Sequence, residues 1–165
     1  MKKLKYLALV VLLVPVAIVL TACGALAAPT GLTRADGNIR FNTVSGADAY
    51  QLRIISAGEE IRINIQLEEN EGDTGAHIEG NTVEIGARGT DRITIEWAEF
   101  NAAVIAKVNL SPTHGGIDSD DRAAFLAGTW RVSVRTIEGV GSTSFRGSDW
   151  SNQISITYND RNPLD

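Results

Sequence analysis

Cysteine occurs only once in this chain of 165 residues, and methionine is equally rare. A disulfide needs two cysteines, so Cys23 forms none within the chain. A chain of this length corresponds to one domain, which can bury a core large enough to be stable without such a link. The fold therefore depends on side-chain packing and on backbone hydrogen bonds.

Motifs for enzymatic chemistry are also missing. The sequence has no Gly-x-Ser-x-Gly nucleophile elbow, no Gly-rich phosphate loop before a helix and no His-Glu-x-x-His zinc motif. His77 and His114 have no second ligand at a zinc spacing. The carboxylates of Asp118, Asp120 and Asp121 are weak candidates for calcium, because a full calcium loop needs more oxygen ligands and a fixed glycine. We therefore expect no metal, no other cofactor and no enzymatic activity.

A single long apolar run is present, over residues 6–20, directly after a start with three lysines. The run is shorter than the roughly 20 residues that span a bilayer, and it contains Pro15. A basic start, an apolar centre and small residues before a cleavage site identify residues 1–22 as a secretion signal. A membrane-spanning helix and an ordinary cleaved signal, with Cys23 incidental, are the alternatives.

The end of this signal, Leu20-Thr21-Ala22-Cys23, resembles the lipobox of bacterial lipoprotein precursors. The resemblance implies that Cys23 becomes the new N-terminus and carries two or three acyl chains of the palmitate kind, a firmer anchor than one chain provides. Residues 23–29 are mostly small and form a short tether, so the domain should sit close to the membrane. The expected location is extracytoplasmic, on the cell membrane or the outer membrane.

Basic residues are few in the mature chain. Removal of residues 1–22 takes three lysines from the 15 basic residues and leaves 12 against 20 acidic ones, a net charge of −8, with Lys107 as the only lysine. An acidic surface disfavours nucleic acid and anionic phospholipid as partners. We therefore expect contact with the membrane through the lipid on Cys23, and an unknown protein or glycan as the ligand.

Strand-like alternation of apolar and polar residues recurs along the chain. It is cleanest over residues 61–67 and also marks residues 38–42, 50–54, 82–85, 92–97, 129–135 and 153–158. Residues 68–80 are polar and acidic and are predicted to form a loop. Many short strands with Gly-rich turns indicate an all-β fold, an antiparallel β-sandwich. Its core should contain the inward-facing residues Ile39, Phe41, Tyr50, Leu52, Ile54, Trp130, Val132, Val134 and Ile156.

Two stretches in the middle of the chain are not simple strands. Residues 99–110 fit a strand by their alternation and a helix by the spacing of their apolar residues. Residues 118–126 predict one short helix, with Asp118 as the N-cap and Gly128 as the stop signal.

Both ends of the domain resemble a fibronectin type III module. At the front, Ala28-Pro29-Thr30-Gly31-Leu32 matches the opening proline and strand A, and residues 37–50 look like strand B, a turn and the start of strand C. At the back, residues 126–134 resemble the approach to strand F, with Trp130 in place of the tyrosine of the tyrosine corner. Ser148-Asp149-Trp150-Ser151-Asn152 resembles the start of strand G.

The resemblance implies a fibronectin type III-like sandwich over residues 30–158, with an insertion at about residues 57–125 and a tail at residues 159–165. By analogy with this fold, we expect a lipid-anchored binding or adhesion module without enzymatic activity. Binding usually resides on loops and insertions of a rigid scaffold. The partner-facing surface is therefore expected on residues 68–80 and 112–121.

Two further hypotheses assign ligand contacts to particular side chains. In the first, the protein is a carbohydrate-binding accessory lipoprotein whose Trp150 and Trp97 contact the sugar, since exposed aromatic rings are enriched at binding surfaces. In the second, Glu96 and Glu99 flank Trp97 as the two carboxylates of a small glycoside hydrolase. Lys107 could act as a base, although nothing beside it in the sequence indicates a lowered pKa.

Replacement of Cys23 by serine tests the lipid anchor. The Cys23→Ser variant lacks the thiol that the lipobox resemblance assigns to the lipid, so it should leave the membrane fraction or accumulate as uncleaved precursor. Metabolic labelling with palmitate, followed by membrane fractionation, measures both effects. A variant that still incorporates labelled palmitate would contradict the lipobox assignment.

Overall fold

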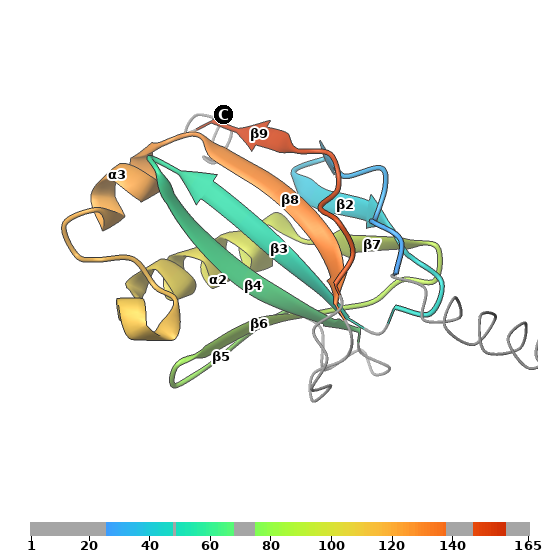
Figure 1. The fold of residues 1–165 in the computed structure, drawn as a ribbon, viewed down its shortest axis with the longest axis horizontal. Helices are drawn as coiled ribbons and strands as arrows, with labels where there is room; N and C mark the ends of the chain where they lie inside the picture. The colour runs from blue at the N-terminus through green and yellow to red at the C-terminus, as the bar shows by residue number, and fades with distance from the viewer. Residues whose placement is uncertain (1–25, 48, 68–74, 138–146, 158–165) are drawn as a thin grey trace, which may run out of the picture.

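Two β-sheets and a long helix enclose one hydrophobic core (Figure 1). The computed structural model describes residues 26–47, 49–67, 75–137 and 147–157. The predicted signal, Cys23, the first part of the acidic loop at residues 68–74, Tyr158 and the tail at residues 159–165 lie outside these residues. Within the described residues the chain is predominantly β, with two sheets, as the sequence predicted.

The small sheet has three antiparallel strands in the order β1-β2-β7, with the bounds Thr33–Ala35, Asn38–Asn42 and Arg92–Ile95. Alternation directs Ile39 and Phe41 of β2 inward, opposite Ile95 and Ile93 of β7, and all four side chains are buried. Because each side chain lies directly across from an apolar neighbour, the inner face of this sheet is continuously hydrophobic.

The large sheet has six strands in the order β5-β6-β4-β3-β8-β9. Only the β4–β6 pair is parallel, and all the other pairs are antiparallel. The bounds are Ala49–Ser56 for β3, Glu59–Leu67 for β4, Gly75–Glu79 for β5, Thr82–Ala87 for β6, Trp130–Ile137 for β8 and Ile154–Ile156 for β9.

The two faces of the large sheet differ in character. Leu52 of β3 pairs with Ile63 of β4 and with Val134 of β8, and all three side chains point inward and are buried. The residues between them point to the other face, which carries Gln51, Arg53, Arg62, Asn64, Ser133 and Arg135. We call this polar side, turned away from the small sheet, the outer face.

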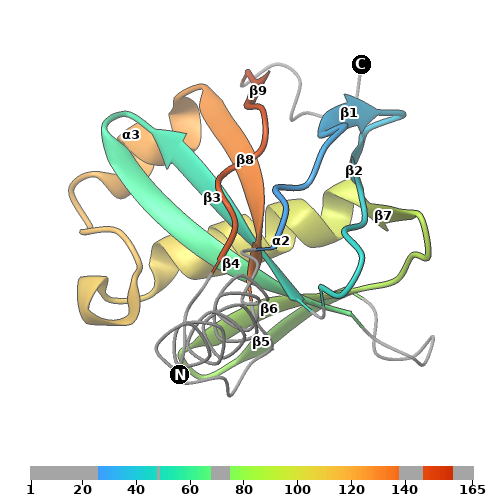
Figure 2. The same ribbon diagram turned by 45° about the vertical axis from the view of Figure 1, so that its right-hand side comes forward.

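Helix α2 (Trp97–Asn109) covers the part of the large sheet that the small sheet leaves open. Its buried residues Phe100, Ala103, Val104 and Val108 form one stripe, and the helix contacts β4, β5 and β6 (Figure 2). This settles the ambiguity over residues 99–110 in favour of a helix. A 3₁₀ turn (η2, Pro112–His114) and helix α3 (Arg122–Ala127) follow.

Trp130 joins the helices to the large sheet. Its ring centroid lies 6.1 Å from that of Phe100 in α2 and 6.3 Å from that of Phe125 in α3. Its indole Nε1 donates a hydrogen bond of 3.1 Å to the carbonyl oxygen of Phe125. The hydroxyl of Ser56 donates to the same oxygen at 2.9 Å, so α3 is bound to both β3 and β8.

The segment before β9 is held against β8 by serine side chains. The Thr136 amide donates to Ser148 Oγ at 3.0 Å, and the Ser148 amide donates to the Thr136 carbonyl at 3.1 Å. Ser151 repeats this exchange with Val134, at 3.1 Å and 2.8 Å. The hydroxyl oxygens thus accept from β8 amides that a neighbouring strand would otherwise satisfy.

The nine predicted core residues are all buried, which confirms that part of the prediction. The predicted bounds of two segments were wrong. Residues 75–79 form strand β5 instead of continuing the loop, because their backbone pairs with β6. The predicted strand over residues 92–97 ends at Ile95, and Trp97 begins α2. The middle holds α2 in addition to the one short helix predicted, as the helical alternative for residues 99–110 allowed.

Asp118 is not the N-cap of the short helix. Its carbonyl and carboxylate accept the amides of Asp121 and Asp120 in a turn, at 3.1 Å and 3.2 Å. Helix α3 begins four residues later, at Arg122, and its N-cap position is Asp121, whose side chain makes no capping bond. Gly128 ends the helix as predicted, but in an extended conformation.

Substitution of Tyr50 tests how the turn before β3 is held. The Tyr50 side chain is fully buried, and its hydroxyl accepts a hydrogen bond of 2.9 Å from the Val44 amide. Tyr50→Phe removes this acceptor, so we expect a loss of about 1 kcal/mol in the free energy of unfolding, measured by urea denaturation at pH 7.

Comparison with the same variant also tests how the free energy of unfolding depends on alkaline pH. Burial raises the pKa of Tyr50 above its ordinary value, and the hydrogen bond from Val44 opposes this shift. The unfolded chain therefore ionises Tyr50 first, at about pH 10, and stability is lost as the pH rises from there towards the raised pKa. The native protein should lose stability above pH 10 more steeply than Tyr50→Phe. Parallel curves would show that Tyr50 ionises equally easily in both states.

Candidate functional site

Three arginines surround Trp150 on the outer face. The guanidinium carbons of Arg53 and Arg135 lie 4.3 Å and 4.7 Å from the centre of the Trp150 ring, and that of Arg62 lies 6.0 Å away. These are cation–π distances. We call Arg53, Arg62, Arg135 and Trp150 the arginine–tryptophan cluster.

Hydrogen bonds fix the arginines of this cluster from neighbouring strands. Arg135 donates from Nε and a terminal nitrogen to Gln51 Oε1, at 3.2 Å and 2.7 Å. Arg53 Nε donates to Ser133 Oγ at 3.2 Å, and Arg62 Nε donates to Glu60 Oε1 at 2.7 Å. Three strands, β8, β3 and β4, therefore contribute one cation each at defined positions.

Like charges lie close together in this cluster. Arg53 and Arg62 are directly opposite each other across the β3–β4 pair, an arrangement that is unfavourable for equal charges. Burial lowers the pKa of Arg135, and the positive charges of Arg62 and Arg53 lower it further. Arg53 and Arg135 form no ion pair with any carboxylate of the described residues. Three cations thus lie close together on one face of a domain whose net charge is negative.

A polar pocket of about 280 Å³ adjoins the cluster. It opens beside the point where the β4–β6 ladder begins, at Asn64 and Glu84. It shares Arg62 with the cluster, and it also contains Gln51, the hydrogen-bond partner of Arg135. Its lining residues are Gln51, Arg62, Asn64, Asn81, Thr82, Val83, Glu84 and Lys107. We call it the lysine pocket.

Lys107 reaches this pocket from helix α2. Its Nζ donates a hydrogen bond of 2.8 Å to the carbonyl of His114, and burial lowers its pKa. His114 in turn lies 3.2 Å from the Asn81 side-chain nitrogen through Nε2 and 2.7 Å from Ser111 Oγ through Nδ1. These bonds connect the β5–β6 turn with η2. The turn begins at Gly80, the last residue of one region predicted to face a partner, and η2 lies in the other.

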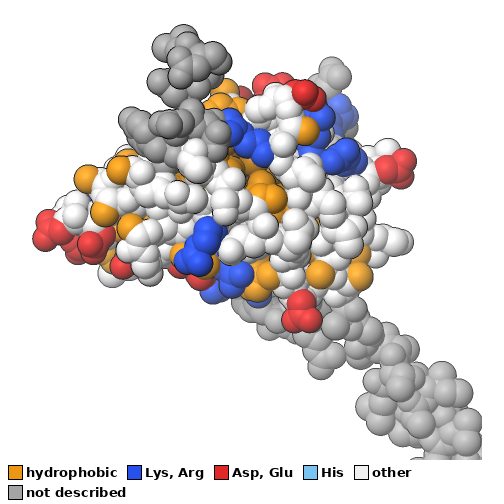
Figure 3. All heavy atoms as spheres, turned by 90° about the horizontal axis from the view of Figure 1, so that it is seen from above, with side chains coloured by type: hydrophobic (Ala, Val, Ile, Leu, Met, Phe, Trp, Pro, Cys, Tyr) orange, Lys and Arg blue, Asp and Glu red, His pale blue; other side chains and the backbone are white. Residues whose placement is uncertain are grey.

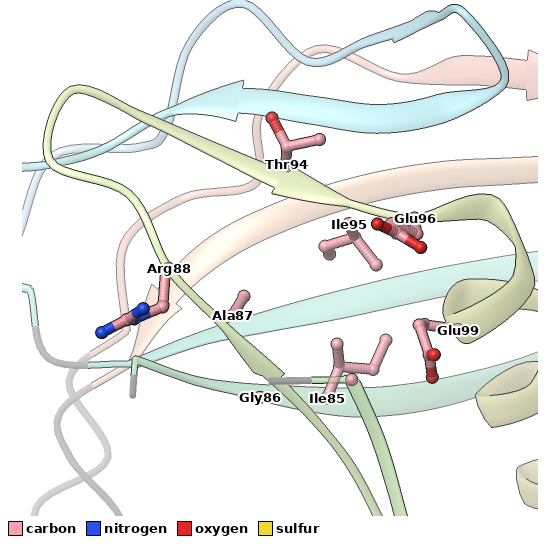
Figure 4. Close-up of a pocket in the computed structure, with 9 residues that line it drawn as sticks. Ile85, Gly86, Ala87, Arg88, Thr94, Ile95, Glu96 and Glu99 are labelled. Atoms are coloured by element: carbon pink, nitrogen blue, oxygen red, sulfur yellow. The ribbon is translucent and has the colours of Figure 1, made fainter. Parts of the chain in front are cut away.

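Glu96 and Glu99 line a second pocket, of about 240 Å³, together with Arg88 and Thr94 (Figure 4). Glu99 Oε2 accepts a hydrogen bond of 2.7 Å from the Ala76 amide, so this carboxylate fastens β5 to α2. Gly75 permits the close approach, since its φ is +108° and a Cβ would lie 3.1 Å from Glu99 Oε2. The two predicted carboxylates therefore line the same pocket, but that of Glu99 is already engaged in holding β5 to α2.

Trp97 lines a shallow groove of about 630 Å³ with Asn38, Glu96, Asn101 and Ile105. The guanidinium carbon of Arg34 lies 4.6 Å from the centre of the Trp97 ring, and Phe100 and Trp130 lie 5.5 Å and 6.4 Å away. The Trp97 amide donates to Asn38 Oδ1 at 3.2 Å.

The two tryptophans predicted to contact ligand therefore lie at different sites. Trp97 starts α2 on the inner side of the large sheet, whereas Trp150 stacks on arginines of the outer face. Both rings are half-buried. Trp150 is thus less open than an exposed sugar platform would be, because guanidinium groups already lie against it.

The acidic candidates lie at the end of the molecule that carries α3. Asp118, Asp120 and Asp121 are exposed there, and acidic side chains gather at this end (Figure 3). Among the described residues, no three His, Cys, Asp or Glu side chains are grouped so as to hold a metal ion. In the same part of the chain, no helix has the length and hydrophobicity needed to cross a membrane.

The arginines were not singled out from the sequence, although a signal was present. Alternation alone places Arg53, Arg62 and Arg135 opposite to the apolar core residues of their strands. The pairing of these strands, which brings the three charges together, is not encoded in any local pattern. No protein-family model matches the chain, and neither does any curated protein.

The bond between Glu99 and Ala76 yields a test of the second pocket. Glu99→Ala should make the Ala76 amide exchange with solvent about tenfold faster, since a hydrogen bond to a charged group contributes about 1.5 kcal/mol. Glu99→Gln keeps an acceptor and should exchange nearly as the native protein does. Hydrogen–deuterium exchange read by NMR measures the rate at Ala76.

Glu96→Ala is the matched control for this experiment. It removes a carboxylate from the same pocket, but the Glu96 side chain makes no capping hydrogen bond. Equal acceleration at Ala76 in Glu96→Ala and Glu99→Ala would show that loss of charge, and not loss of the bond, loosens β5.

Proposed function

We propose that this protein is a lipid-anchored, extracytoplasmic binding module built on a fibronectin type III-like sandwich, without enzymatic activity. The observation that carries the proposal is a face that gathers three arginines and a tryptophan, and that no other sheet or helix of the described residues covers, on a domain of net negative charge. Such a face is a candidate surface for a partner, because charges and aromatic rings placed by rigid strands can recognise a ligand without reorganising.

The strand arrangement supports the fibronectin-like part of the proposal. In immunoglobulin-like sandwiches, strands A, B and E share one sheet, and strands C, F and G share the other. The segment resembling strand B is β2 of the small sheet here, and the segment resembling strand A, residues 28–32, directly precedes β1 of the same sheet. The segments resembling C, F and G are β3, β8 and β9 of the large sheet. By this correspondence, β7 takes the place of strand E.

Trp130 supports the same comparison. In the tyrosine corner, a tyrosine near the start of strand F bonds to the backbone a few residues upstream. Trp130 is the first residue of β8, and its indole bonds to the carbonyl of Phe125, five residues upstream. A different side chain thus makes a bond of the same kind.

The position of the N-terminal segment supports an orientation in which the end with α3 points away from the membrane. Thr136, near the end of β8, donates a hydrogen bond of 3.3 Å to the Ala27 carbonyl, whereas α3 packs beside Trp130 at the start of that strand. Six steps of a strand separate these positions by about 20 Å. With a lipid on Cys23, the end with α3 and η2 would point outward, and the outer face would be open to the side.

Carbohydrate binding is the second candidate. The groove along Trp97 favours it, since an aromatic ring lies there beside the amides of Asn38 and Asn101 and the carboxylate of Glu96. A glycoside hydrolase using Glu96 and Glu99 ranks third, because Glu99 is already bonded to the Ala76 amide. If the protein had glycosidase activity and the Glu96→Gln variant retained it, Glu96 would not be a catalytic carboxylate, and this third candidate would be excluded.

Protease treatment of intact cells tests the proposed placement. An extracytoplasmic, lipid-anchored domain should be degraded by added protease in intact cells of a Gram-positive host, or after permeabilisation of the outer membrane in a Gram-negative host. The Cys23→Ser variant should be absent from the washed membranes or be found there only as uncleaved precursor. Complete protection of the native protein until the inner membrane is lysed would contradict the proposal.

A further inference from the structure

We propose that the arginine–tryptophan cluster and the adjoining lysine pocket bind an anionic saccharide, with the sugar ring in the pocket and its carboxylate held by Arg62 and Lys107. The inference rests on the proposed function, because it names the ligand class of that binding module. It assigns a role to Lys107 and to three arginines that neither the core nor the sheet pairing requires.

The charge balance of this surface favours an anion. Arg53, Arg62, Arg135 and Lys107 supply four cations, whereas Glu60 and Glu84 are the carboxylates among the residues that contact or line the site. The whole mature chain has the opposite balance, with a net charge of −8. Placing Arg53 directly opposite Arg62 opposes folding, and a bound anion would relieve their repulsion.

Donors remain available on these arginines. Within the described residues, Arg53 and Arg62 each use only Nε in a hydrogen bond, which leaves their terminal nitrogens without an acceptor from that part of the chain. A guanidinium can hold a carboxylate through two parallel hydrogen bonds. The Arg62 side chain is 52% exposed, so an incoming ligand can reach it.

The pocket lining favours a saccharide over other anions. Gln51, Asn64 and Asn81 present amides, and Thr82 presents a hydroxyl, which are groups that donate to and accept from sugar hydroxyls. The volume of about 280 Å³ is at the lower end of small-molecule pockets and suits one sugar ring. An acidic peptide would gain little from this lining, because it offers Val83 as its single apolar side chain.

Trp150 has a positioning role in this site. Its ring lies against Arg53 and Arg135, and the bonds of Ser148 and Ser151 to β8 fix the segment that carries it. The guanidinium planes of Arg53 and Arg135 are thereby held in place. Preorganised donors lose less conformational entropy on binding than flexible ones.

Calorimetric titration of the full chain, extracted from membranes in detergent, tests the inference. The probes are short oligosaccharides of galacturonate, glucuronate and sialic acid, compared with neutral galactose oligosaccharides of equal length. At least one carboxylated probe should bind at least tenfold more tightly than its neutral counterpart. Arg62→Gln and Lys107→Met should each weaken this binding about tenfold or more.

Arg40→Gln is the matched control, because Arg40 is on β2 of the small sheet, where it pairs with Asp36 at 3.1 Å. It removes one positive charge from the domain and should leave the affinity unchanged. Lys107→Arg keeps the charge in the pocket and should retain part of the binding. If Lys107→Met fails to fold, as circular dichroism would show, the exposed Arg62→Gln decides the result.

Two further probes test whether the site binds a different class of anion. A glutamate-rich peptide, or vesicles containing phosphatidylglycerol, that bound more tightly than every carboxylated sugar would overturn the saccharide assignment. So would equal affinity for neutral and carboxylated sugars, or equal weakening by Arg40→Gln. A protein that is lipidated and exposed to external protease but binds none of these sugars refutes this inference alone and leaves the proposed function standing.

Discussion

The inner face of the large sheet is hydrophobic and must be shielded from water, and the rest of this structure depends on that requirement. β3, β4, β6 and β8 direct isoleucine, leucine and valine side chains to that face, and each such side chain contributes about 1.5–3 kcal/mol when it is buried. The small sheet, with strands of three to five residues, covers only part of it. Helix α2 covers the remainder, which explains why the connection between β7 and β8 is long and contains a helix with a buried apolar stripe.

The outer face follows from the same requirement. Because every second residue of β3, β4 and β8 is committed to the core, the residues between them must point outward. Antiparallel sheets tolerate one solvated face, so nothing in the described residues needs to cover it. The serine bonds along β8 then bring Trp150 over two arginines. The cluster is thus positioned by the core, although it contributes nothing to it.

Sequence reasoning could locate the core and most strands but not the site. The core followed from local alternation, which needs no knowledge of pairing. Strand β5 was missed because its side chains are largely exposed, and it is held by backbone pairing with β6 and by Glu99 of a distant helix. Helix α2 was ambiguous because its apolar residues satisfy both periods. The opposition of Arg53 and Arg62 depends on the β3–β4 register, and their meeting with Trp150 depends on two serine side chains.

The contrast between the arginine–tryptophan cluster and the acidic end that carries α3 has a consequence for selectivity. At a Debye length of about 8 Å, an anion approaching the end with Asp118 and Asp121 is repelled locally, whereas one approaching Arg53 and Arg62 is attracted. A long polyanion that covers the whole domain would meet both regions, so its gain at the arginines would be offset elsewhere. A short ligand, or the end of a chain, meets only the cluster. The charge distribution therefore favours a small anionic group that enters the pocket over a polymer that wraps the surface.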